Sequence, residues 1–177
     1  MYPARRHWCF FLTTLFFLTL DLWSKHMAFT RIAPYEWVTV WDGVFELRTT
    51  LNPGMMWGRF QNVPAPVWVG LRGAVLLGLV WVYFSLRDDA KLVQFAFGLV
   101  AGGAMGNIYD NVFQGTHGGN GLFAGAVRDF LRITLFEFPT FNVADSCICV
   151  GAPLLLIILW NHDRKRAALA KAEGNAT

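Results

Sequence analysis

Four long apolar stretches constrain this chain more than any other feature of its sequence. They cover about residues 8–27, 64–86, 92–113 and 139–160. Each stretch reaches the roughly 20 residues that an α-helix needs to cross the hydrocarbon core of a bilayer. The sequence therefore predicts an α-helical membrane protein, a single domain over residues 1–177 with four transmembrane helices.

The composition agrees with this prediction and argues against a soluble or nucleic-acid-binding protein. Of the 177 residues, 55% are hydrophobic and only 15% are charged, whereas soluble domains have about 25% charged residues. The eight Trp and sixteen Phe residues suit the aromatic belts at membrane edges. The net charge is only +3 and no basic cluster interleaves with aromatic residues, so nucleic acid is not an expected partner.

The first apolar stretch has two possible interpretations. Its basic start, at Arg5 and Arg6, and its apolar middle are also typical of a cleaved signal peptide. However, Asp21 and Lys25 occupy the region where a signal peptide carries small residues for cleavage. We therefore expect the first helix to be retained.

The distribution of basic residues predicts the orientation in the membrane. Eight Lys and Arg residues lie on the side of the two termini, and five lie in the two loops on the opposite side. Cytoplasmic segments carry the excess of Lys and Arg, so both termini are predicted to be cytoplasmic. The two outer segments, about residues 28–63 and 114–138, then face the other side.

The two outer segments differ in character. In the first, residues 37–41 and 44–48 are rich in β-formers and flank Asp42-Gly43, a strong signal for a two-residue hairpin turn. A small extracytoplasmic β-element is therefore predicted on the outer membrane surface. The second segment holds five glycines between residues 115 and 125, so its first half is expected to be mobile.

Polar residues gather near the predicted outer ends of the first and third helices. Asp21 and Lys25 are four residues apart, so they share a helix face and are expected to pair as a salt bridge. Asn107 and Asp110 are three residues apart at the end of the third helix and also share a face.

The fourth helix and the outer loops add polar residues on the same side. Asn142 and Asp145 lie at the start of the fourth helix, with Asp145 about six residues, or about 9 Å, into the span. Asn52 and Asp129 come from the two loops. A carboxylate in a span costs at least ~2.5 kcal/mol, so it indicates function. The asparagines either orient these acids or join helices by hydrogen bonds.

These residues favour acid–base catalysis by a pair of carboxyl groups. The four histidines are isolated from one another, so no metal site is predicted, and no other cofactor is expected. Two close carboxyl groups share one proton, because both cannot ionise cheaply. One then acts as acid and the other as base, which permits peptide hydrolysis by water.

Five segments, in this order along the chain, resemble the motifs of lipoprotein signal peptidase (signal peptidase II). They are Leu20-Asp21-Leu-Trp-Ser24-Lys25, Asn52-Pro-Gly54-Met-Met-Trp-Gly58, Gly106-Asn107-Ile-Tyr-Asp110, Val127-Arg-Asp129-Phe130 and Phe141-Asn142-Val-Ala-Asp145-Ser146. A single such segment would be weak support, but five in order on four predicted spans are specific.

The resemblance implies an aspartic endopeptidase of the bacterial inner membrane with its active site facing the periplasm. Such an enzyme removes signal peptides from diacylglyceryl-modified prolipoproteins by water attack at the bond before the lipidated cysteine. Lipidated prolipoproteins, membrane lipid and the inhibitor globomycin are the implied partners. The resemblance makes Asp129 and Asp145 the catalytic pair. The implied supporting or substrate-positioning residues are Asp21, Lys25, Asn52, Gly54, Asn107, Asp110 and Asn142.

The chain departs from the family pattern in two places. Asn111 stands where the family usually has Arg, which leaves the partner of Asp110 open. The spacing from Asp110 to Asp129 is longer than usual, and the glycine-rich insert is either a lid or a tolerated loop. Two rival functions stay open here: a small cation transporter that uses intramembrane acids, and an inactive relative that serves as a scaffold.

Overall fold

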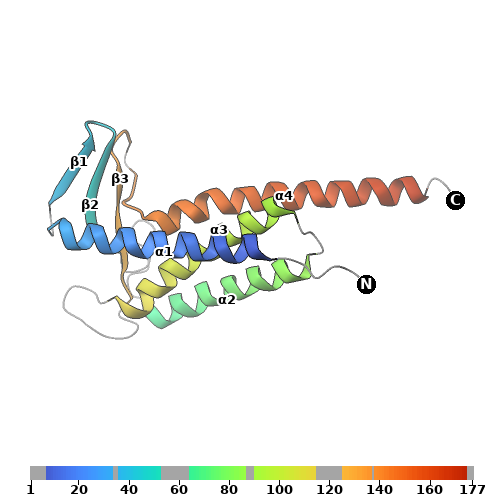
Figure 1. The fold of residues 1–177 in the computed structure, drawn as a ribbon, viewed down its shortest axis with the longest axis horizontal. Coiled ribbons are helices and arrows are strands. Elements are labelled where there is room, and N and C mark those ends of the chain that lie inside the picture. The colour runs from blue at the N-terminus through green and yellow to red at the C-terminus, as the bar shows by residue number, and fades with distance from the viewer. Residues whose placement is uncertain are drawn as a thin grey trace.

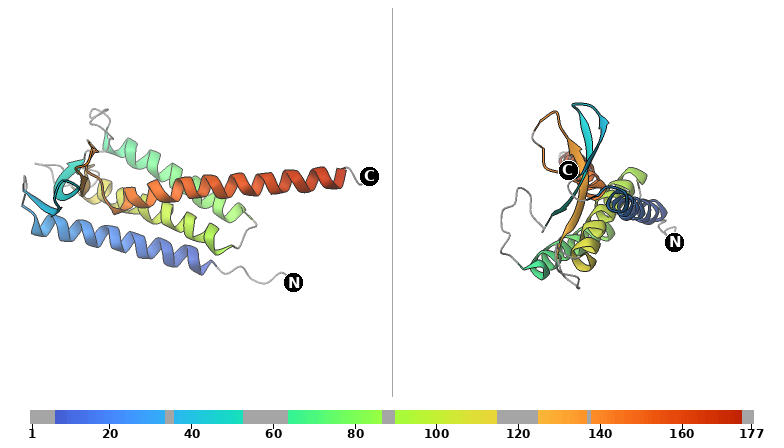
Figure 2. Two further views of the ribbon diagram at one scale, coloured as in Figure 1. Left: turned by 90° about the horizontal axis from the view of Figure 1, so that it is seen from above. Right: turned by 90° about the vertical axis from the view of Figure 1, so that its left-hand side faces the viewer.

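The computed structural model describes residues 7–33, 36–52, 64–86, 90–114, 125–136 and 138–174. Within these residues the elements are α1 (Trp8–Arg31), β1 (Trp37–Trp41), β2 (Phe45–Asn52), α2 (Ala65–Ser85), α3 (Lys91–Phe113), β3 (Val127–Ile133) and α4 (Val143–Gly174). The helices run lengthwise, and the strands gather at one end of the bundle (Figure 1). At the opposite end, α4 extends beyond the other helices (Figure 2).

α3 is the central helix, and its glycines allow close packing. A Cβ atom added at Gly98 would lie 2.7 Å from the backbone oxygen of Phe10 in α1. One added at Gly103 would lie 2.6 Å from the backbone oxygen of Ala144 in α4. Small residues let helix backbones approach each other in this way, as is common in membrane proteins. α1 and α4 are therefore both held tightly against α3.

In the part of the chain that the structure describes, three helices, α2, α3 and α4, are long and apolar enough to cross a membrane. α2 exposes large apolar side chains, such as Leu77 (72% exposed) and Trp81 (71% exposed), as a lipid-facing helix would. α1, with 24 residues, is long enough to cross a membrane, but its most apolar part is less apolar than those of these three helices. It carries Asp21 and Lys25 near its outer end. By length and composition, three of the four predicted transmembrane helices are therefore supported.

The predicted β-hairpin is confirmed, with a longer turn than expected. β1 and β2 pair antiparallel, and Trp41 lies opposite Phe45, so three residues, Asp42–Val44, connect the strands. Gly43 adopts a φ of +67°, which glycine tolerates best. The signal at Asp42-Gly43 located the turn correctly but not its length.

The third strand was not predicted from the sequence. β3 lies in the second outer segment and pairs antiparallel with β2, which gives the strand order β1-β2-β3. Thr50 lies opposite Asp129, and Asn52 lies opposite Val127. This pairing brings the two outer segments together and places Asn52 close to Asp129. The glycine-rich residues 115–124, expected to be mobile, lie outside the described residues.

The start of α4 corrects the sequence prediction. The helix begins at Val143 and not near residue 139, so Asp145 lies in its first turn and not about six residues into the span. The backbone before it pairs with the sheet through a bridge between Leu131 and Phe141. Asn142 then caps the helix, since its Oδ1 accepts a hydrogen bond from the Asp145 N–H at 2.9 Å. The bridge at Phe141 keeps the preceding backbone extended, and the Asn142 cap begins the helix, so α4 starts later than predicted.

Candidate active site

The two acids predicted to react come from different elements at the same end of the bundle. Asp129 lies on β3 and is only 2% exposed, whereas Asp145 lies in the first turn of α4 and is half-buried. Burial, and then repulsion from Asp145, raise the pKa of Asp129 from 3.8 to about 7. Asp129 therefore retains a proton at pH values where an exposed aspartate has lost it.

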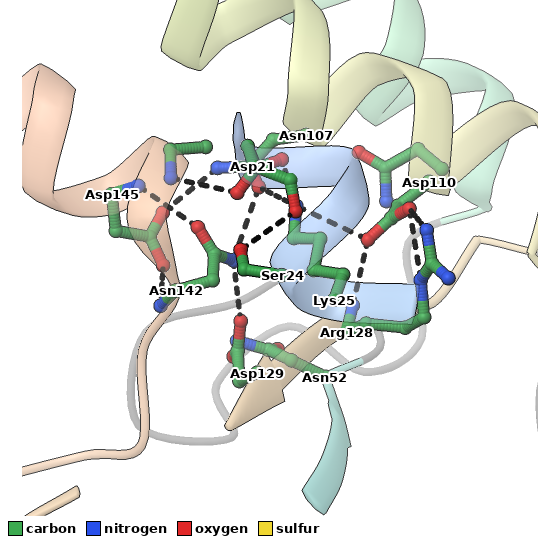
Figure 3. A network of polar contacts seen from close by, with 12 residues as sticks. Asp21, Ser24, Lys25, Asn52, Asn107, Asp110, Arg128, Asp129, Asn142 and Asp145 are labelled. Atoms are coloured by element: carbon green, nitrogen blue, oxygen red, sulfur yellow. Dashed lines mark hydrogen bonds and ion pairs between the residues drawn. The ribbon is translucent and has the colours of Figure 1, made fainter. Parts of the chain in front are cut away.

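Asn142 connects the two acids (Figure 3). Its Nδ2 donates a hydrogen bond to Asp129 Oδ1 at 2.7 Å. Its Oδ1 accepts from the Asp145 N–H, and its own N–H donates to Asp145 Oδ2 at 3.3 Å. The last two bonds form a capping box, in which the residue before the helix and the third helical residue satisfy each other. The cap of α4 thereby fixes the position of Asp145 relative to Asp129.

Two further asparagines complete the hydrogen bonds of the acids. Asn52 Nδ2 donates to the second oxygen of Asp129, Oδ2, at 3.0 Å. Asn107 Nδ2 donates to Asp145 Oδ1 at 2.8 Å. All four carboxyl oxygens of the two acids thus accept a hydrogen bond. Amide donors hold the carboxyl groups in place without taking up their protons.

A buried charge cluster lies beside the acids. Lys25 and Asp21 are wholly buried and form the predicted ion pair, with 2.7 Å between Nζ and Oδ2. The same Nζ lies 3.2 Å from Asp110 Oδ2 and donates to Asn107 Oδ1 at 3.1 Å. Asp21 Oδ1 accepts from the Ala144 N–H at 2.8 Å. The cluster therefore joins α1, α3 and the start of α4.

Arg128 is a part of the site that the sequence predictions missed. Its Nη2 and Nε lie 2.8 Å and 3.2 Å from Asp110 Oδ1, and its backbone N–H donates to Asp110 Oδ2 at 3.0 Å. The partner of Asp110, left open because of Asn111, is therefore Arg128 together with Lys25. The available signal was the position of Arg128 in the chain, directly before Asp129.

Arg72 of α2 was also missed. Its Nη1 donates to Asn111 Oδ1, and Asn111 Nδ2 donates to the backbone oxygen of Gly125 at 2.9 Å. Arg72 is attracted electrostatically to Asp145 and Asp129. Its signal in the sequence is that it is the one charged residue of an otherwise apolar helix.

Gly54, predicted to support the site or to position substrate, lies outside the described residues. Among the residues that the structure describes, no three His, Cys, Asp or Glu side chains are placed to hold a metal ion. The arrangement of the described residues is that of two acids held by amide donors and flanked by cations, which suits acid–base chemistry on water.

Most of the chain matches the model of one protein family. The family model described as signal peptidase (SPase) II matches residues 13–161, most of the chain. The chain belongs to the signal peptidase II family. The resemblance inferred from the five motifs is thereby confirmed, and with it a protease of membrane character.

Several relatives are similar to this chain over most of its length. The lipoprotein signal peptidase of Desulfitobacterium hafniense is 35% identical over 73% of this chain and 78% of its own. That of Geobacter sulfurreducens is 33% identical over 85% of this chain and 90% of its own. That of Halalkalibacterium halodurans is 28% identical over 94% of this chain and 99% of its own.

A solved structure supports the fold. A bacterial membrane enzyme superposes with a TM-score of 0.75 at 24% identity, covering 86% of this chain and 87% of that chain. Membership of a protease family sets aside the transporter hypothesis for this chain. Activity measurements are what distinguish an active enzyme from an inactive relative.

Proposed function

We propose that this protein is an aspartic endopeptidase that removes signal peptides from diacylglyceryl-modified prolipoproteins. The bond cut is the one before the lipidated cysteine. Relatives named lipoprotein signal peptidase support the substrate class. The observation that carries the mechanism is Asn142, which bonds to Asp129 and Asp145 at once.

The two acids have distinct roles in the proposed mechanism. Asp129, whose pKa is raised to about 7, acts as the acid, and Asp145 acts as the base. Asp145 takes a proton from water, and the water oxygen attacks the scissile carbonyl carbon. Asp129 gives its proton to the carbonyl oxygen, which forms a tetrahedral diol without a covalent enzyme intermediate.

The second step restores the acids. Asp145, now protonated, donates its proton to the amide nitrogen of the leaving cysteine. Asp129 takes a proton back from a hydroxyl of the diol, the C–N bond breaks, and the signal peptide leaves with a new carboxyl end. The proposed role of Asn52, Asn107 and Asn142 is to hold both acids in position throughout.

The supporting residues serve to keep the site in shape. Asp21 and Lys25 tie α1 to α3 and α4, and Asp110 ties α3 to β3 through Arg128. Gly54 is proposed to position the substrate, as the family resemblance implies.

We place the protein in the bacterial inner membrane with four spanning helices and both termini in the cytoplasm. α1 has 24 residues, or about 36 Å of helix, which is enough to span. Its exposed side chains include Trp8, Leu12 and Phe16, all more than 60% exposed. The strands and the acids lie at one end of the bundle, away from the C-terminal end of α4, so they face the periplasm in this orientation (Figure 1). Membrane lipid is then the surrounding partner.

Cleavage of a synthetic diacylglyceryl prolipoprotein peptide by the purified full chain tests this function. Mass spectrometry is expected to identify one new amino end at the lipidated cysteine and the released signal peptide. Globomycin is expected to block the reaction, and a peptide without the lipid is expected to be cut poorly. No cleavage by folded protein would favour the inactive relative, and a cut elsewhere would contradict the proposed bond.

A further inference from the structure

α2 contains a single charged side chain, that of Arg72. This helix is long and apolar enough to cross a membrane, and few of its residues are buried. An arginine in such a helix is costly and in membrane proteins generally faces a functional interior. Arg72 is half-buried and turned toward α3, where it donates to Asn111.

The contact with Asn111 connects Arg72 to the strand that carries Asp129. Asn111 is wholly buried, and its Nδ2 donates to the backbone oxygen of Gly125, which lies two residues before β3. Gly125 has a φ of +89°, so the chain turns sharply here before entering the strand. Asn111 therefore holds both the guanidinium group of Arg72 and the entry to β3.

Arg72 interacts electrostatically with the two candidate catalytic acids. It is attracted to Asp145 and to Asp129. Among the described residues, the other charged groups near the site are Asp21 and Lys25 of α1, Asp110 of α3 and Arg128 of β3. Lys25 is paired with Asp21 and Asp110, and Arg128 is paired with Asp110, so both cations contact other carboxylates, although Lys25 also attracts Asp129.

We propose that Arg72 is a positioning residue for Asp129 and Asp145: anchored by Asn111, its guanidinium group stabilises the negative charge of the acid pair from α2. The inference rests on the proposed aspartic mechanism. In that mechanism the pair carries one negative charge before water attack, and a nearby cation favours this state. Arg72 acts through the two acids and does not touch the reacting atoms.

The pH profile of kcat/KM for the lipidated peptide tests this proposal. Without the cation, the acid pair loses its proton less readily, so Arg72→Gln is expected to move the pH profile of kcat/KM toward alkaline pH by about half to one pH unit. Arg72→Lys keeps the charge but loses the planar fork. It is expected to keep the wild-type profile within about 0.2 pH unit while lowering kcat about three- to tenfold.

A matched control and a reciprocal exchange complete the experiment. Arg31→Gln removes an exposed arginine at the end of α1 and is expected to leave profile and rate unchanged. The double variant Arg72→Asn with Asn111→Arg moves the cation from α2 to α3. It is expected to return the profile to within about 0.3 pH unit of wild type. If Arg72→Gln does not fold, Arg72→Met, which also removes the charge and suits an apolar helix, is measured in its place, with the same shift expected.

The outcomes separate this inference from the proposed function. A purely structural Arg72 would lower the rate of Arg72→Gln with no shift of the profile, and that result overturns the inference. A shifted profile in Arg72→Lys or in the exchange variant overturns it as well. If instead Asp129→Asn cleaves normally, the aspartic mechanism itself fails, whatever the profile of the Arg72 variants.

Discussion

Asp129 is the residue whose protonation links the site to the stability of the protein. Its pKa is 3.8 when exposed and about 7 in the fold, so its ionisation opposes folding. The stability that the neutral acid provides is complete below about pH 4 and is lost as the pH rises to about 7. We expect the thermal midpoint of the wild type in detergent to fall over this range more steeply than that of Asp129→Asn. Parallel curves for the two proteins would contradict this assignment.

Lys25 is the residue on which the buried charge cluster most depends. Its removal in Lys25→Met leaves Asp21 and Asp110 buried beside each other without the cation between them. The expected loss in free energy of unfolding is about 3–5 kcal/mol, measured by thermal or denaturant unfolding. The control Lys171→Met, at an exposed position of α4, should change stability by less than about 0.5 kcal/mol.

Exchanging the two charges of the first helix tests how specific the cluster is. Asp21→Lys with Lys25→Asp keeps the pair but is not expected to recover stability. The reason is that Asp21 also accepts from the Ala144 N–H, and Lys25 also lies against Asp110. Full recovery in a double-mutant cycle would show that the pair acts alone.

At the scale of single residues, the sequence was enough to choose candidate site residues but predicted few of the contacts between them. Helical spacing was enough to pair Asp21 with Lys25, because both lie on one helix. The bonds of Asp110 to Arg128 and of Arg72 to Asn111 join different elements, and spacing carries no information about them. Both arginines are nonetheless detectable as charges in an apolar helix or beside a candidate catalytic acid.

At the scale of elements, Gly106 of α3 sets how closely α1 can approach. A Cβ atom added there would collide with Oδ2 of Asp21, the oxygen that binds Lys25. Gly106→Ala is therefore expected to cost about 1–3 kcal/mol in unfolding free energy, with a loss of activity of at least about tenfold. The matched control is Gly78→Ala in α2, where an added Cβ meets no atom within 4 Å. Equal effects of the two changes would contradict the packing argument.

The elements themselves were partly predictable. Four apolar stretches and the Asp42-Gly43 turn predict the helices and the first hairpin, because these depend on local pattern. β3 depends on long-range pairing with β2, and its short sequence between a glycine-rich segment and α4 gave no sufficient signal. The start of α4 was misplaced because the apolar pattern continues through residues that the sheet and the Asn142 cap hold outside the helix.

For the whole molecule, the orientation in the membrane can be tested with single cysteines. In a variant lacking Cys9, Cys147 and Cys149, a cysteine replaces either Asp42 in the hairpin turn or Lys171 near the end of α4. A membrane-impermeant maleimide added to spheroplasts is expected to label the first cysteine and to reach the second only after lysis. The reverse pattern would place the acids on the cytoplasmic side and contradict the proposed function.

Asp129 and Asp145 are proposed to act as one catalytic unit, and turnover of the lipidated peptide by folded variants is the measurement that tests this. Asp129→Asn and Asp145→Asn each keep the shape of the side chain but remove one acid. Each is expected to lose about a thousandfold or more in kcat while still binding substrate, and the double variant should be scarcely worse. Asp42→Asn, in the exposed hairpin turn, should retain full activity. Near-normal cleavage by either single variant, or losses that multiply in the double variant, would contradict the account.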